Sequence, residues 1–172
     1  CRKNGVKYLS SVWDLKSLDW IDKYLDFYKI GSGDLTCYPV IKEFAKRGKP
    51  IILSSGLSKM EELNKTIKFL IKQNSKYKLK RNLSVLQCTS TYPTLDEETN
   101  LNVINTILKN KNITPGYSDH TIGNLALKIA YSMGAQVLEF HFTDTRKNKT
   151  FRDHKVSLTG QETVELINDI NR

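Results

Sequence analysis

An α/β fold made of repeated strand–helix units is predicted for this chain, and two features of the sequence support the prediction. Short β-branched or aromatic runs recur along its 172 residues, and each is followed by a helix-like apolar pattern. Polar or small residues also gather at the C-terminal end of nearly every run. Strands that alternate with helices run parallel, because a helical crossover returns the chain to the same end of the sheet.

The predicted elements follow one another along the whole chain. Strands are expected at 7–12, 27–32, 50–55, 83–89, 114–119 and 137–143. Helices are expected at 17–25, 38–48, 59–73, 101–110, 124–134 and 163–172. Capping boxes at Ser58–Glu61 and Thr159–Glu162 mark two helix starts, and Gly48 and Gly134 mark two helix ends. The chain therefore carries about six βα units.

Such units build either an open doubly wound sheet or a closed (βα)8 TIM barrel. The open sheet is disfavoured because GSG at 31–33 lacks the third glycine of a dinucleotide-binding loop. The barrel is favoured because active sites of that fold lie at the C-terminal ends of the strands, where the polar residues gather. A complete barrel needs eight units and typically ~250 residues. Residues 1–172 are therefore expected to form a partial TIM-barrel domain. The missing strands are expected upstream of residue 1, and a missing C-terminal segment is equally compatible with the sequence.

Composition and charge limit the classes of partner. The chain is 39% hydrophobic and 26% charged, as in ordinary globular proteins. Its formal net charge is +9, but the lysines are dispersed over helix-like segments, which favours a solvated surface over a nucleic-acid patch. Neither an apolar run long enough to span a membrane nor a signal-peptide pattern is present. We expect a cytoplasmic protein without a nucleic-acid or membrane partner, and three widely spaced cysteines without a C-x-x-C pair fit a reducing compartment.

The strand expected at 137–143 places two ionisable side chains inside an apolar run. Successive strand side chains point to opposite faces, so Glu139 and His141 share one face while the apolar residues of Leu138–Phe142 take the other. A second histidine, His120, follows the preceding strand. A lone histidine is usually a hydrogen-bonded structural residue, but two at neighbouring strand ends with Glu139 beside them favour a metal site.

Five motifs in chain order resemble the signatures of the sialic acid synthase family, which includes the legionaminic and pseudaminic acid synthases. The motifs are YKIGSGD (28–34), KPIILSSG (49–56), LQCTSTYPT (86–94), GYSDHTIG (116–123) and LEFHFT (138–143) followed by DHKVSL (153–158). They cover nearly the whole chain, with one motif at each strand end. The resemblance implies condensation of phosphoenolpyruvate with an N-acylated aminosugar aldehyde, such as N-acetylmannosamine, to a nine-carbon α-keto sugar acid with release of phosphate.

The resemblance also implies a metal and a catalytic pair. His120 and His141 match the metal ligands, and Mn²⁺ or another divalent cation such as Mg²⁺ is the expected cofactor, polarising the sugar carbonyl. Asp34 matches an acidic position that moves a proton as water attacks, although an Asx turn or a helix cap explains it equally well. Lys29 supplies a point charge for phosphoenolpyruvate at the end of its strand.

The remaining site residues come from the same resemblance. Donors to phosphoenolpyruvate are expected at Ser11, Ser32, Ser90 and Ser118. Ser90 stands where the family often has asparagine, which shortens its reach, and Ser11 matches a family threonine less closely. The sugar pocket is expected to contain Tyr92, Glu139 and Asp153, with Glu139 alternatively supporting the metal ligands. Tyr92 precedes Pro93 and alternatively braces a turn.

Two other functions remain open from the sequence. One is a different barrel aldolase or isomerase that uses Lys29 as a Schiff-base lysine, and the other is a non-catalytic binding or scaffold fragment. The family resemblance further implies a C-terminal antifreeze-like domain, outside residues 1–172, and a homodimeric full-length protein. The sequence leaves open which aminosugar is used and whether that sugar carries a 6-phosphate.

Overall fold

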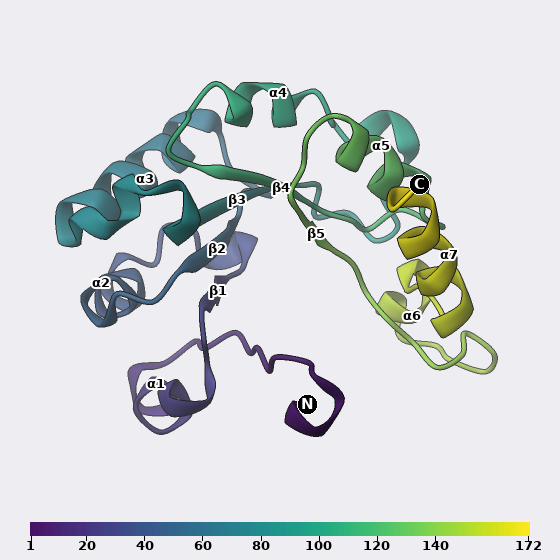
Figure 1. Ribbon diagram of the computed structural model, residues 1–172, viewed down its shortest axis with the longest axis horizontal. Coiled ribbons are helices and arrows are strands. Elements are labelled where there is room, and N and C mark those ends of the chain that lie inside the picture. Colours follow the sequence, from purple (N-terminus) through teal and green to yellow (C-terminus); the bar gives the residue numbers. More distant parts are fainter. The chain divides into compact units, whose positions relative to one another are not determined.

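The computed structural model describes residues 1–172, the side chain of Arg2 excepted. The chain divides into two compact units, the first formed by Cys1–Val85 with Lys111–Ile113 and the second by Leu86–Asn110 with Thr114–Arg172. Figure 1 shows the strands β1 (Tyr28–Ile30), β2 (Ile51–Ser54), β3 (Leu83–Cys88), β4 (Thr114–Ser118) and β5 (Val137–Glu139). The helices are α1 (Leu15–Ile21), α2 (Tyr38–Arg47), α3 (Met60–Gln73), α4 (Val103–Leu108), α5 (Leu125–Ser132), α6 (Arg152–Val156) and α7 (Gly160–Ile170). Short 3₁₀ helices occupy Arg2–Asn4, Asp22–Tyr24, Ser32–Asp34, Ser75–Lys78, Lys80–Asn82 and Asp96–Glu98.

The sheet has the parallel order that repeated βα units produce. Its strands follow the chain order β1-β2-β3-β4-β5. In the first unit β1 pairs with β2 in parallel, with Lys29 opposite Ile52, and in the second unit β4 pairs with β5, with Gly116 opposite Val137. Because the C-terminal ends of paired parallel strands lie at one edge, the residues that follow β1 and β2 lie together in the first unit, and those that follow β4 and β5 lie together in the second.

The first unit packs α2 on its strands. Helix α2 has a proline, Pro39, in its first turn and ends at Gly48, whose φ of 72° is a left-handed conformation that glycine adopts without strain. The buried side of the helix places Phe44 on Tyr28 of β1, with ring centroids 4.5 Å apart. This stacking orients β1, and with β1 the lysine that follows Tyr28.

The second unit builds its core between β4, α5 and α7. Its buried side chains include Tyr117 from β4, Leu127 from α5 and Leu166 from α7. Leu138 and Phe140 pack against this core as predicted, but Phe142 is 63% exposed, so the apolar face of that strand ends at Phe140.

Several boundaries differ from the sequence prediction. Residues 7–12 form no ladder beyond an isolated parallel bridge from Ser11 to Lys29. The strand predicted at 137–143 divides into β5 and a bridge from Phe142 to Leu158. The sequence did not predict α6 or the pairing at Leu158, because runs of three to five residues are too short to show a periodicity. The sheet therefore has five strands and two bridged flanks in place of six full strands.

One of the two predicted capping boxes is confirmed. The Thr159 backbone N–H donates to Glu162 Oε2 at 2.8 Å, and the Glu162 N–H donates back to Thr159 Oγ1 at 3.5 Å. The box predicted at Ser58–Glu61 is wrong by one residue. Glu62 accepts from the Lys59 N–H at 2.9 Å, because the Ser58 hydroxyl donates to the Ser55 carbonyl at 2.7 Å instead.

Candidate functional site

Lys29 is fixed at the centre of the first unit's sheet edge. It lies in the middle of β1, and its Nζ donates to Ser54 Oγ, at the end of β2, at 2.9 Å. Ser54 is buried, and a hydroxyl is a neutral acceptor, so this contact positions the ammonium without cancelling its charge. The bridge between Ser11 and Lys29 brings the predicted donor Ser11 next to Lys29 along the backbone.

Ser32 and Asp34 share the short 3₁₀ helix that follows β1. Ser32 Oγ accepts from the Gly56 backbone N–H at 3.0 Å, which ties the turn after β1 to the turn after β2. Cys37, rather than Asp34, is the N-cap residue of α2, and no side-chain hydrogen bond caps that helix. The Asp34 carboxylate is therefore not the cap of α2, which was one of the two structural explanations for it, beside an Asx turn.

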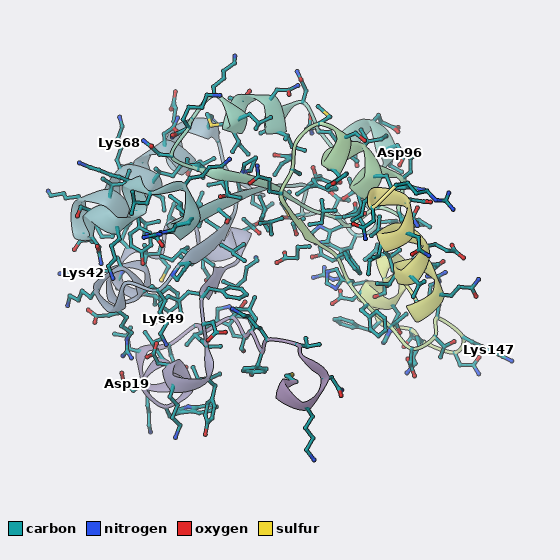
Figure 2. The ribbon with its side chains drawn as sticks, in the orientation of Figure 1. Asp19, Lys42, Lys49, Lys68, Asp96 and Lys147 are labelled. Carbon is teal, nitrogen blue, oxygen red and sulfur yellow. The ribbon has the colours of Figure 1, made fainter. Side chains whose placement is uncertain are left out.

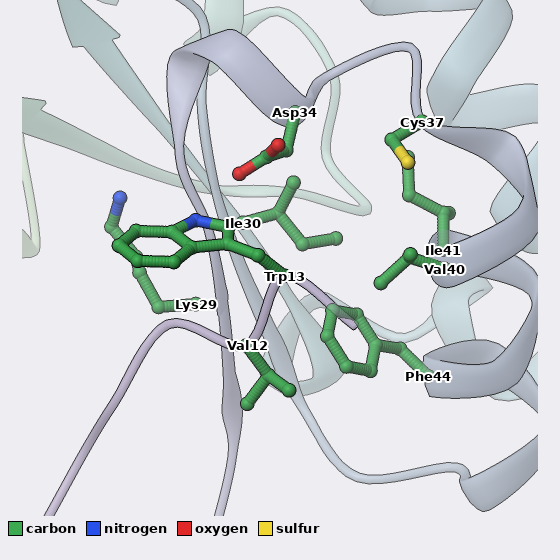
Figure 3. Close-up of a pocket in the computed structure, with 9 residues that line it drawn as sticks. All are labelled: Val12, Trp13, Lys29, Ile30, Asp34, Cys37, Val40, Ile41 and Phe44. Atoms are coloured by element: carbon green, nitrogen blue, oxygen red, sulfur yellow. The ribbon is translucent and has the colours of Figure 1, made fainter. Parts of the chain in front are cut away.

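Asp34 and Lys29 both line a small cavity of the first unit (Figure 3). The cavity has a volume of about 10 Å³, which accommodates roughly one water molecule. Its other walls are mostly apolar and come from Val12, Trp13 and α2. A carboxylate and an ammonium thus face a space of the size of one water inside an apolar lining.

His120 is the more buried of the two ligand candidates in the second unit. The residue is 6% exposed, and its Nδ1 lies 2.7 Å from the Thr89 carbonyl oxygen. A carbonyl only accepts hydrogen bonds, so Nδ1 carries the hydrogen and the neutral ring holds its lone pair on Nε2. The Tyr92 hydroxyl lies 2.6 Å from Nε2 and donates to that lone pair.

Tyr92 connects the two predicted metal ligands. Its ring stacks on His120 with centroids 4.0 Å apart and meets the His141 ring edge-on at 5.5 Å. Burial, reinforced by nearby negative groups that include Asp153, raises the pKa of Tyr92 to about 12. The phenol therefore keeps its proton near neutral pH and remains a donor. The Tyr92–Pro93 peptide bond is cis.

His141 faces His120 across a short gap. The centroids of the two rings are 5.3 Å apart. Burial lowers the pKa of His141, against an opposing contribution from Asp153, so the ring is neutral near pH 7. His141 Nδ1 lies 3.7 Å from Asp153 Oδ2, which is too long for a hydrogen bond. The two imidazoles that the sequence suggested as metal ligands therefore lie close together.

Carboxylates organise the strand ends around the imidazoles. The predicted donor Ser118 is buried and gives its hydrogen bond to Glu139 Oε1 at 2.7 Å. Asp119 is 3% exposed and accepts from the Tyr117 hydroxyl at 3.0 Å and from the Thr121 N–H at 2.9 Å. These bonds fix the turn after β4 and with it the direction of His120.

A match to a family model covers residues 1–172, and the model is that of the NeuB family. The chain belongs to the NeuB family. The N,N'-diacetyllegionaminic acid synthase of Campylobacter jejuni is 36% identical over 172 residues, which cover 99% of this chain and 50% of that protein. The human N-acetylneuraminate-9-phosphate synthase is 34% identical over 170 residues, covering 96% of this chain and 45% of that protein. The NeuB-family chain thus spans about half the length of the curated relatives it matches.

The similarity extends to structure. A crystal structure of N-acetylneuraminic acid synthetase from Leptospira borgpetersenii, in complex with citrate, superposes on this NeuB-family chain with a TM-score of 0.90. The two are 25% identical, and the match covers 99% of this chain and 58% of that one. The parallel strand order and this match confirm the predicted fold class, a partial (βα)8 barrel. None of the helices that the structure describes is both long enough and apolar enough to cross a membrane.

The residues of this NeuB-family chain fit a divalent cation with two protein ligands. Metal-ligating histidines usually donate their other N–H to a carbonyl or carboxylate, as His120 does to Thr89. The lone pair that faces Tyr92 is the one available to a metal. Within the side chains that the structure describes, no three or more His, Cys, Asp or Glu residues are grouped to hold a metal ion. The two imidazoles would therefore be the protein's ligands to such an ion and would leave coordination positions for substrate and water.

Sequence reasoning missed some residues that position the candidate functional side chains within each unit. Ser54 holds Lys29, Asp119 holds the His120 turn, and the Arg152 guanidinium lies 4.7 Å from the centre of the Tyr92 ring. Ser54 and Asp119 stand inside the quoted motifs, so their place at a strand end was a usable signal. Ser90 lies beside the imidazole half, with its Oγ 4.0 Å from the Cys88 sulfur.

Proposed function

We propose that the full-length protein condenses phosphoenolpyruvate with an N-acylated aminosugar aldehyde to a nine-carbon α-keto sugar acid and releases phosphate. Membership of the NeuB family and relatives named as sialic and legionaminic acid synthases support this proposal. The observation that carries it is the pair of imidazoles, whose ring centroids are 5.3 Å apart, with His120 Nε2 directed at the Tyr92 hydroxyl. Such a pair is suited to a divalent cation.

His120 and His141 would hold the cation, with Mn²⁺ as the first candidate and Mg²⁺ as the second. When bound, the ion supplies Lewis-acid polarisation of the sugar carbonyl, which makes the aldehyde carbon electrophilic. The protein's own residues orient both rings. Thr89 fixes the His120 tautomer, and burial keeps the pKa of His141 low.

The first unit supplies groups suited to phosphoenolpyruvate. Lys29 offers an ammonium to its phosphate or carboxylate, with Ser11 and Ser32 as neighbouring donors. In the reaction a carbon–carbon bond forms between C3 of phosphoenolpyruvate and the aldehyde carbon. Water then adds to C2, and the bond from C2 to the phosphate oxygen breaks to leave the ketone. Asp34, which faces a space for about one water, is the candidate base for that addition.

The second unit supplies groups suited to the sugar. Glu139 and Asp153 are acceptors for sugar hydroxyls, and Tyr92 offers an aromatic face and a hydroxyl. Ser90 and Ser118 are the remaining donor candidates for phosphoenolpyruvate. A homodimer, a cytoplasmic location and the absence of nucleic-acid and membrane partners complete the proposal for the full-length protein.

The test is an assay of the full-length protein with phosphoenolpyruvate, Mn²⁺ and candidate aminosugar aldehydes, following phosphate release and the keto acid. His120→Ala and His141→Ala should each weaken Mn²⁺ binding by roughly 100-fold or more and abolish phosphate release. His154→Ala, the third histidine of the chain, should leave the Mn²⁺ affinity near that of the wild type. Equal Mn²⁺ affinities of the wild type and the three histidine variants would contradict the proposed metal site.

Borohydride trapping separates the competing aldolase function. A Schiff-base enzyme would leave a reduced substrate adduct on Lys29, whereas the proposed synthase releases phosphate without an adduct. Lys29→Arg keeps the charge and removes the amine, so it should retain phosphoenolpyruvate binding in a synthase and abolish an aldolase.

A further inference from the structure

A basic pocket of about 300 Å³ opens in the second unit. It is lined by Tyr92 and by residues of the segment 146–155, among them the four cations Arg146, Lys149, Arg152 and Lys155. The Thr150 hydroxyl and the His154 ring also face it. A concave space of this size suits one small anionic group rather than a nucleic-acid backbone or a lipid surface.

Local sequence explains why the cations gather. The Lys149 N–H donates to the Arg146 carbonyl at 3.3 Å, and Asn148 takes a left-handed φ of 59°, so a tight turn brings Arg146 and Lys149 together. Arg152 and Lys155 are three residues apart in α6, which places them on the same side of that helix.

The four cations differ in the strength of their contacts with neighbouring acidic residues. Arg146 is committed, because its guanidinium forms a two-pronged contact with Glu162 and also donates to the Ser157 carbonyl at 2.6 Å. Lys149 lies 3.6 Å from Asp144, a carboxylate that is 76% exposed, so that attraction is weak. Arg152 Nε lies 3.6 Å from Asp153, beyond hydrogen-bonding distance.

Lys155 completes the set of available charges. It is exposed and forms no ion pair within the part of the chain whose side chains the structure describes. Two lysines and one arginine thus remain able to bind an anion, beside the hydroxyl of Thr150. Lysine and arginine with a hydroxyl donor is the usual protein environment of a phosphate monoester.

The basic pocket adjoins the imidazole pair. Tyr92 lines the pocket and also donates to His120, and Arg152 lies over the Tyr92 ring. Asp153, the neighbour of Arg152, lies 3.7 Å from His141. A small molecule whose aldehyde reaches the imidazoles would therefore have its far end in the basic pocket.

We infer that the basic pocket binds a phosphate group carried by the aminosugar at the end opposite its aldehyde, so that the preferred substrate is an aminosugar 6-phosphate. The inference rests on the proposed function for the identity of the sugar. Lys149, Lys155 and Arg152 hold the phosphate, and Thr150 donates to it. The phosphate then fixes the sugar in the direction that presents its aldehyde to His120 and His141.

The test compares N-acetylmannosamine with its 6-phosphate as substrates of the full-length protein, using the ratio of their kcat/KM values. The wild type should favour the phosphosugar. The double variant K149Q/K155Q should lower that ratio by about 100-fold, because each lysine that is replaced removes one charge-assisted hydrogen bond worth roughly tenfold in affinity. The decrease should fall mainly on KM for the phosphosugar, and added salt should weaken binding of that substrate alone.

Lys147→Gln is the matched control. Lys147 belongs to the same turn and carries the same charge, but it lies outside the pocket lining and extends away from the chain (Figure 2). Lys147→Gln should change the ratio of the two kcat/KM values by less than about twofold. A wild type that prefers the neutral sugar would overturn the inference, as would a K149Q/K155Q protein in which KM rises for phosphoenolpyruvate instead.

Failure of the proposed function has a separate signature. If neither sugar is condensed, calorimetric titration of the wild type with N-acetylmannosamine 6-phosphate still reports on the pocket. Binding that K149Q/K155Q loses and Lys147→Gln keeps would support a phosphosugar site in a protein of different activity. No heat of binding from the wild type would overturn the inference.

Discussion

The two units hold their functional side chains by different chemistry. In the first, the Lys29 ammonium donates to the Ser54 hydroxyl, and the Ser32 hydroxyl accepts from the Gly56 N–H. In the second, the carboxylates of Asp119 and Glu139 accept hydrogen bonds at the strand ends, and the Asp153 carboxylate lies 3.7 Å from His141. Hydrogen bonds in which one partner is charged are about twice as strong as neutral ones. The contacts named for the two units therefore differ in the acceptor, which is neutral for Lys29 in the first unit and a carboxylate in the second.

Two buried tyrosines show the same contrast at one residue type. Tyr77 of the first unit donates to the backbone carbonyl of Lys49 at 2.8 Å. Tyr117 of the second donates to the Asp119 carboxylate at 3.0 Å. Burial raises the pKa of both, so each phenol is a permanent donor at neutral pH. The acceptor distinguishes these two tyrosines, and Tyr28 of the first unit also donates to a carboxylate, that of Asp22.

The largest effect on stability is expected from a substitution that adds a side-chain atom next to β4. A Cβ added at Gly116 would lie 2.2 Å from Leu86 Cδ2 and 2.6 Å from the Val137 carbonyl oxygen. Because the carbonyl belongs to the paired strand β5, Gly116→Ala should force the strands apart and destabilise the second unit by about 3 kcal/mol. Hydrogen exchange should show reduced protection in β4 and β5.

Gly33→Ala in the first unit is the control for that substitution. Nothing lies within 4 Å of a Cβ placed there, and the residue is exposed. Its effect on stability should stay below about 0.5 kcal/mol. Equal destabilisation from the two glycine substitutions would contradict the packing of β4 on β5 described above.

The next largest effect is the loss of stability when each of the two tyrosines is replaced by phenylalanine. Tyr117→Phe should cost about 2 kcal/mol of unfolding free energy, because a buried carboxylate loses a donor, whereas Tyr77→Phe should cost about 1 kcal/mol. Chemical denaturation of the two variants under identical conditions measures the difference. Tyrosine variants of equal stability would show that the charge of Asp119 adds nothing to its hydrogen bond with Tyr117.

The difference between strand ends and irregular loops explains how far the sequence could predict the candidate site. Lys29, His120 and His141 each sit at the end of a run with clear strand periodicity, so their shared edge of the sheet was predictable. The contact between Tyr92 and His120, and the cluster of Arg146 with Lys149, depend on irregular loops that leave no period in the sequence. Strand-end residues were therefore predictable and loop-borne residues were not, except where a family motif supplied them.

The smallest effect is a pH dependence of stability that arises at Glu162 in the second unit. The Arg146 guanidinium, aided by the Thr159 N–H, lowers the pKa of Glu162 from 4.5 to about 2. A carboxyl whose pKa is lower when folded stabilises the protein fully above its unfolded pKa and loses that contribution as pH falls through the folded pKa. Between about pH 5 and pH 2 the second unit should therefore lose stability. The pair is partly exposed and screened by solvent, so the loss should be only about 1 kcal/mol.

Glu162→Gln isolates this contribution. The glutamine keeps the length of the side chain and the cap on the Thr159 N–H but removes the charge that Arg146 attracts. The variant should be less stable than the wild type at pH 6 and should converge with it near pH 2, because protonation of Glu162 leaves the wild type equally without that charge. Hydrogen exchange at α7 as a function of pH measures both curves. Parallel curves, with a constant gap down to pH 2, would mean that the charge of Glu162 does not cause the difference in stability.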